Sequence, residues 1–139
     1  MIYLAMTPRR ILAIDLTSRG FGFVVFEAGR PIDWGTTYTR GNRRAVVLRR
    51  LADLMRRLRP HRLLIEDYAA AESRRCRRVK QLLGAIERQA SDLGVKARRV
   101  PDRAVRAHFC AAGAVTKRQR AVLIASRFPE LAPRLPPVR

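Results

Sequence analysis

The apolar positions of this chain form short runs in its first part. Residues 11–14 and 21–26 are almost continuously apolar, and Arg19 and Gly20 separate them. Runs of this length bounded by turn signals predict strands over about 10–16 and 21–27, the first buried on both faces. Residues 32–38 alternate between polar and aromatic and predict a half-exposed edge strand. Three strands with short links predict an antiparallel meander.

Later apolar positions recur every three or four residues. This spacing predicts an amphipathic helix over 43–59, which Pro60 ends, and a second over 74–93, which Gly94 ends. Short strands are predicted over 63–68 and 95–100, and helices over 102–110 and 117–128, with Thr116 as the N-cap of the last. The proline-rich tail over 129–137 is expected to be extended and not helical.

This order of elements predicts an α/β fold. Three antiparallel strands followed by two parallel ones form a mixed five-stranded sheet flanked by helices. The strand over 63–68 can then lie directly beside the strand over 10–16. We expect a leader over 1–9, one domain over 10–128 and a tail over 129–139, since 139 residues suffice for one core.

The net charge of +19 limits the kinds of partner that the chain is expected to bind. Thirty basic residues face 11 acidic ones. Such a field favours a polyanionic partner, above all nucleic acid, with ribosomal or membrane-surface attachment as alternatives. No apolar run is long enough to span a bilayer, so no membrane partner is expected. Cys76 and Cys110 match no zinc or disulfide pattern, so a reducing, cytoplasmic location is expected.

Two carboxylates stand out because each lies in or at the end of a predicted strand. Asp15 interrupts the first strand and Glu66 ends the fourth. A buried carboxylate needs a cation or an arginine partner, and Asp15 alone does not decide between them. On adjacent strands the two would converge, and oxygen ligands suit Mg²⁺ or Mn²⁺, the ions of phosphodiester hydrolysis. The alternative is that arginines neutralise each acid separately.

Several short motifs carry a resemblance to a known family. They are Ile14-Asp15, Ser18-Arg19, Gly22, Ile65-Glu66 and the basic helix start Lys117-Arg118. Together they look like the ribonuclease H-like superfamily, and within it the RuvC-type Holliday junction resolvases. The resemblance implies a homodimeric, Mg²⁺-dependent endonuclease that cuts branched DNA. It also implies that Asp15 and Glu66 are metal ligands, that Lys117 is a catalytic basic residue, and that Arg106 is another basic position.

The chain departs from that family in two places. The family commonly has Asp-Pro-Gly-Ser where this chain has Asp15-Leu16-Thr17-Ser18. The family also takes further acids from a final helix, which is not expected before residue 139. Asp67 and Asp102 are the nearest substitutes, but strand alternation points Asp67 away and a helix N-cap explains Asp102. We therefore expect slow cleavage or none, and the alternative function is a nucleic-acid-binding protein with an incomplete catalytic set.

The densest basic run opens the second predicted helix. Cations at a helix N-terminus oppose the helix dipole, so this run indicates phosphate contacts that do not read sequence. The residues assigned to nucleic-acid binding are Arg74, Arg75, Arg77, Arg78, Lys80, Arg106 and Arg118. The same helix contains the small residues Gly84 and Ala85, which predict the interface of a homodimer.

Overall fold

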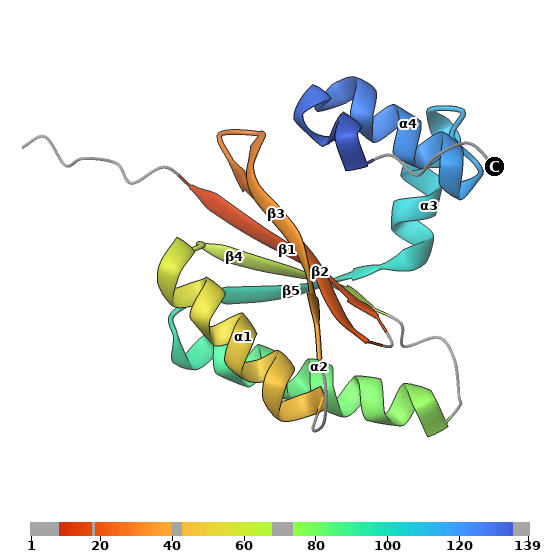
Figure 1. Ribbon diagram of the computed structural model, residues 1–139. Helices are drawn as coiled ribbons and strands as arrows, with labels where there is room; N and C mark the ends of the chain where they lie inside the picture. The colour runs from red at the N-terminus through yellow and green to blue at the C-terminus, as the bar shows by residue number, and fades with distance from the viewer. Residues whose placement is uncertain (1–8, 18, 40–42, 68–73, 135–139) are drawn as a thin grey trace, which may run out of the picture. The chain divides into compact units, whose positions relative to one another are not determined.

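A computed structural model describes residues 9–17, 19–39, 43–67 and 74–134 of the chain (Figure 1). It divides into two compact units, Met1–Arg99 and Val100–Arg139. The sequence predicted one domain over 10–128 and a tail over 129–139. That division stays a prediction, and the two observed units are described separately below.

The first unit is built on the predicted mixed sheet. Its strands are β1 (Arg10–Thr17), β2 (Gly20–Glu27), β3 (Arg30–Tyr38), β4 (Arg62–Asp67) and β5 (Lys96–Pro101), the last ending just past the boundary, in the order β3-β2-β1-β4-β5. Strands β1, β2 and β3 pair antiparallel, and β4 pairs parallel with β1. The α/β fold and the β1–β4 adjacency are confirmed, and β3 is an edge strand as predicted.

Two amphipathic helices cover one face of this sheet. Helices α1 (Arg43–Leu58) and α2 (Arg74–Asp92) lie on the same side of it in Figure 1. Their apolar stripes share one core with alternate residues of the strands. The largest fully buried side chains of that core are Leu12, Phe21, Val25, Val47, Leu51, Leu63, Ile65, Leu83 and Ile86.

Strand β1 is not buried on both faces, so that prediction is wrong. Leu12, Ile14 and Leu16 are buried against the helices, whereas Asp15 and Thr17 on the opposite face are exposed. The apolar run gave no sign of this because the residues alternating with the core positions include Ile11 and Ala13, which are apolar but only half-buried. Asp15 therefore sits on the face of the sheet that α1 and α2 leave open.

The second unit is helical. It contains α3 (Asp102–Ala111), α4 (Lys117–Arg127) and the 3₁₀ helix η1 (Pro129–Arg134). Thr116 caps α4 as predicted: its side chain accepts from the Gln119 N–H while the Gln119 side chain accepts from the Thr116 N–H. The expectation of an extended tail is wrong over 129–134. A single 3₁₀ stretch tolerates prolines because short 3₁₀ pieces require few backbone donors.

The first hairpin requires glycine at position 20. Gly20 is buried opposite Thr17, and a Cβ there would collide with the carbonyl oxygen of Thr37 on β3. We expect Gly20→Ala to lower the free energy of unfolding by about 2 kcal/mol, because backbone atoms cannot move aside as a side chain can. Gly22→Ala is the control, since its Cβ would meet only one atom, at 3.9 Å. Equal urea midpoints for the two variants would contradict this.

Candidate active site

The two predicted metal ligands lie at the carboxyl ends of neighbouring parallel strands. The β1–β4 ladder pairs Ile11 with Arg62 and ends with Ile14 opposite Ile65. Asp15 and Glu66 are the next residue on each strand, so the same register places them side by side. Adjacent strands are about 4.8 Å apart, and both residues alternate with buried ones, so both lie on the open face. Asp15 is exposed and Glu66 is half-buried.

Gly22 leaves the β2 side of Asp15 without a neighbouring side chain. Gly22 on β2 is the antiparallel partner of Asp15, and residues directly opposite each other share a face. Thr36 on β3 follows Gly22 across the sheet and is exposed. The surface on that side of Asp15 is therefore formed by backbone and a small polar side chain. A large ligand can approach Asp15 from this side.

Asp67, the discounted ligand, lies on the opposite face. Strand β4 continues through Asp67, so its side chain alternates with Glu66 and shares the face of Leu63 and Ile65, which are buried. Arg99 on β5 donates from Nε to Oε1 of Glu87 on α2, at 3.0 Å. That hydrogen bond raises the pKa of Arg99 against the lowering effect of burial, and the charges of Glu87 and Asp67 raise it further. Asp67 thus belongs to the helix-covered side.

Arg43 is a residue at this end of the sheet that the sequence analysis missed. It opens α1, and its guanidinium donates to the carbonyl oxygen of Thr17, two residues from Asp15. Its Nε is buried and has no hydrogen-bond partner within the described structure. The contact fixes the end of β1. A cation in the first turn of a helix was the available signal, since it opposes the dipole.

The predicted basic run begins α2, which follows the Glu66 end of β4 in the chain. Arg77, Arg78 and Lys80 are exposed. The side chains of Arg74 and Arg75 lie outside the described residues. The exposed cations leave this helix start able to contact phosphates, and α2 has no acid in its first turn.

The remaining predicted site residues belong to the second unit. Lys117 and Arg118 open α4 and are exposed. Nε of Arg106 forms an ion pair with Oδ2 of Asp102 at 2.8 Å, one turn apart on α3. Asp102 is not the N-cap of α3 as expected; Pro101 holds that position, and no side chain caps the helix.

The donors at the β1–β4 edge fit a hard divalent cation in type. Asp15 and Glu66 offer carboxylate oxygens, the ligands that Mg²⁺ and Mn²⁺ prefer. Within the described part of the chain, no group of three or more His, Cys, Asp or Glu residues gathers where it could hold a metal ion. The open face therefore provides two protein anchors among these residues.

No family model and no curated protein matches the chain. Among solved structures, RuvC from Thermus thermophilus in complex with a Holliday junction substrate has a TM-score of 0.74 at 17% identity, covering 87% of this chain and 80% of that one. A second Thermus thermophilus RuvC structure has a TM-score of 0.68 at 18% identity, covering 84% and 78%. The chain therefore has a RuvC-like, ribonuclease H-like fold. None of the described helices is long and apolar enough to cross a membrane.

Proposed function

We propose that this chain is a metal-dependent endonuclease that cuts branched DNA, as the RuvC-type resolvases do. The observation that supports it is the pairing of Asp15 and Glu66 on adjacent parallel strands of a RuvC-like fold, on the open face. One solved structure of that fold is a RuvC bound to a Holliday junction substrate. The charge of +19 supplies the attraction for such a polyanion.

Asp15 and Glu66 would hold Mg²⁺ or Mn²⁺ through carboxylate oxygens. When bound, the ion would supply a water of lowered pKa and charge stabilisation at the scissile phosphate. The exposed Arg77, Arg78 and Lys80, together with Arg74 and Arg75, neutralise phosphates along the DNA backbone. We assign the same role to Arg106 and Arg118. Lys117 is assigned to the cleaved phosphate by resemblance.

A second function is favoured by the carboxylate count. Two-metal hydrolysis usually requires three or four anchors, and the described residues of the open face provide two. The alternative is therefore a nucleic-acid-binding protein of this fold whose catalytic set is incomplete and which does not cut the DNA that it binds.

Single-turnover cleavage decides between the two functions. The protein in excess is incubated with a labelled four-way junction, or a linear duplex of the same sequence, in Mg²⁺, Mn²⁺ or EDTA. The nuclease proposal expects slow cleavage of the junction that needs a divalent ion, and less cleavage of the duplex. Tight junction binding without cleavage in either ion would contradict the nuclease proposal and support the binding function.

The bare flank of Asp15 gives a test of access. Gly22→Leu places a bulky side chain about 5 Å from Asp15 on the same face, and we expect junction cleavage to fall about tenfold or more. Gly22→Ala adds a single methyl group and should retain most of the rate. Far-UV circular dichroism checks that both variants fold. Undiminished cleavage by Gly22→Leu would show that substrate does not approach from the β2 side.

The homodimer is part of the proposal, because two active sites are needed to cut two strands of a junction. Helix α2 was the predicted interface. Ala85 is buried in the chain's own core, whereas a Cβ added to Gly84 would meet open space. We therefore expect a partner to approach at Gly84. Sedimentation equilibrium should give a dimer at micromolar concentration, and Gly84→Arg should dissociate it. A wild-type monomer at tens of micromolar would contradict the dimer.

A further inference from the structure

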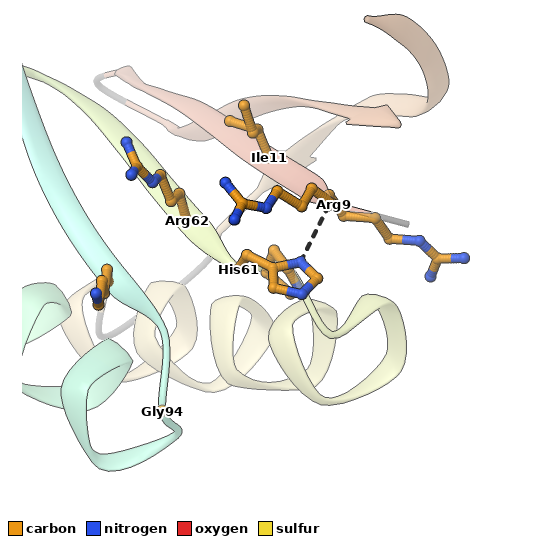
Figure 2. Close-up of a pocket in the computed structure, with 8 residues that line it drawn as sticks. Arg9, Ile11, His61, Arg62 and Gly94 are labelled. Atoms are coloured by element: carbon orange, nitrogen blue, oxygen red, sulfur yellow. Dashed lines mark hydrogen bonds between the residues drawn. The ribbon is translucent and has the colours of Figure 1, made fainter. Parts of the chain in front are cut away.

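Two hollows lie at the end of the sheet opposite the carboxylate pair. One has a volume of about 510 Å³ and is lined where β1 and β4 begin, around His61 and Arg62 (Figure 2). The other has a volume of about 460 Å³ and lies at the end of α1. Pro60 and Gly94 line both hollows, so the two lie next to each other, and we call them together the amino-end trough.

The lining of the trough is strongly basic and, among the described residues, contains no carboxylate. Its cations are Arg9, Arg10, Arg56, Arg59, Arg62 and Lys96. Arg10 is already engaged: Nε pairs with Glu27 at 3.2 Å, and the guanidinium donates to the carbonyl oxygen of Leu58. Among the described residues, Arg56 makes only a long ion pair with Asp53, at 3.8 Å.

Four of these cations have no protein partner among the described residues. The side chains of Arg9, Arg59, Arg62 and Lys96 make no ion pair or hydrogen bond there, and all four are exposed. Like charges gathered in one concavity repel one another, and a low-dielectric wall strengthens the field they create. The arrangement is stabilised when an anion occupies the concavity.

His61 adds an oriented donor to the same hollow. Its Nδ1 accepts from the backbone N–H of Arg10 at 3.2 Å, drawn as a dashed line in Figure 2. A neutral imidazole that accepts through one nitrogen carries its proton on the other. Nε2–H is therefore the ring's donor, a group suited to a phosphate oxygen.

The form of the trough indicates a chain of phosphates. A single anion would occupy one hollow, but the cations continue from β4 past Pro60 to the end of α1. Phosphates spaced along a nucleic-acid backbone match such a row, and Arg and Lys contacts to them need no base readout. The trough lies four residues from Glu66 along β4 and five from Asp15 along β1, about 13–17 Å away. A phosphate in the trough cannot also touch the carboxylate pair.

We propose that the amino-end trough binds the phosphate backbone of DNA, as a second contact separate from the Asp15–Glu66 site. This goes beyond the proposed nuclease function, since it requires DNA as a ligand but no cleavage.

The test compares two double variants that remove the same charge. Arg62→Ala with Lys96→Ala removes two trough cations, and Arg49→Ala with Arg50→Ala removes two exposed cations of α1 outside the trough. Affinity for a labelled duplex is measured by fluorescence anisotropy over a range of salt. Each lost phosphate contact lowers the slope of log K against log salt by about 0.9. We expect the trough variant to lose about two units of slope and about tenfold or more in affinity, and the control to lose less than one unit.

A second measurement uses the unsubstituted protein, so it does not depend on how the variants fold. His61 is one of only two histidines, which makes its imidazole resonance simple to assign by substitution. Addition of duplex should shift that resonance at low salt. A shift with inorganic phosphate but none with duplex would assign the trough to a small phosphate ligand and overturn the proposal.

The outcomes separate this inference from the proposed function. Equal salt slopes for the two double variants would overturn the proposal that the trough binds DNA. They would not contradict the proposed carboxylate site. A wild-type protein that failed to bind duplex and junction alike would overturn both. Junction binding without cleavage, combined with the slope change, would support the trough while the nuclease proposal fails.

Discussion

Asp15→Asn is expected to reduce Mg²⁺-dependent cleavage of a four-way junction by about 10²–10³-fold while DNA affinity stays the same or rises. The substitution removes one of the two carboxylates on the open face, and a neutral amide holds a divalent ion poorly. When affinity is measured in EDTA, so that no divalent ion is present, removing a negative charge beside the DNA reduces repulsion of the phosphates and cannot weaken binding to them. Glu66→Gln should behave alike, since the β1–β4 register places it beside Asp15.

Asp67→Asn is the matched control for these two variants. It makes the same carboxylate-to-amide change on β4, the strand that also carries Glu66, but on the face that the helices cover. Its cleavage rate should stay within about twofold of the wild type. Mn²⁺ binding followed by electron paramagnetic resonance gives a readout that needs no cleavage: Asp15→Asn should lose bound Mn²⁺ and Asp67→Asn should keep it. If Asp67→Asn alone lost both the cleavage rate and the bound Mn²⁺, the result would contradict the proposed site and would indicate a metal site on the helix-covered face.

The second large effect is the dependence of DNA affinity on salt. A protein that makes six to ten phosphate contacts loses about 10³–10⁵-fold in affinity between about 50 mM and 200 mM salt. With a net charge of +19, we expect a loss within this range for junction and duplex. Fluorescence anisotropy over a salt series measures it. Affinity that stayed constant over the series would exclude backbone-dominated binding.

The basic residues at the start of α2 provide the variant that tests this prediction. Replacing Arg74, Arg75, Arg77 and Arg78 by alanine should reduce the salt slope and weaken binding to all DNA sequences alike, because phosphate contacts do not read bases. Duplexes of unrelated sequence serve as the comparison. A loss confined to one sequence would indicate base readout by this helix.

Local features of the fold could be predicted from the sequence. The helical stripes placed α1 and α2 because a 3.6-residue period survives any tertiary arrangement. Thr116 signalled the start of α4 because capping is a local interaction, and the structure adds Gln119 as its capping-box partner. The order of strands also limited the sheet to few topologies, which is why the β1–β4 neighbourhood was predicted correctly.

Properties set by what packs on each face of the sheet could not be predicted. An apolar run looks the same whether one face is covered or two, so the exposure of Asp15 was missed. The contact between Arg43 and Thr17 joins residues 26 apart in the chain, and neither neighbourhood signals the other. The 3₁₀ helix in the tail could not be predicted because proline is compatible with this geometry but equally with an extended chain.

The sequence by itself therefore determined the type and order of most helices and strands and the net charge. It also identified Asp15 and Glu66 as a pair of candidate metal ligands. The tertiary structure decided which face each side chain occupies, because strand register assigns alternate residues to opposite sides. It showed that β4 continues through Asp67, so the alternation expected from the sequence does point Asp67 away from Glu66. It also gathered residues 9–11, 55–56, 59–62 and 93–96 into the amino-end trough, since strand starts distant in the chain meet at one end of a sheet.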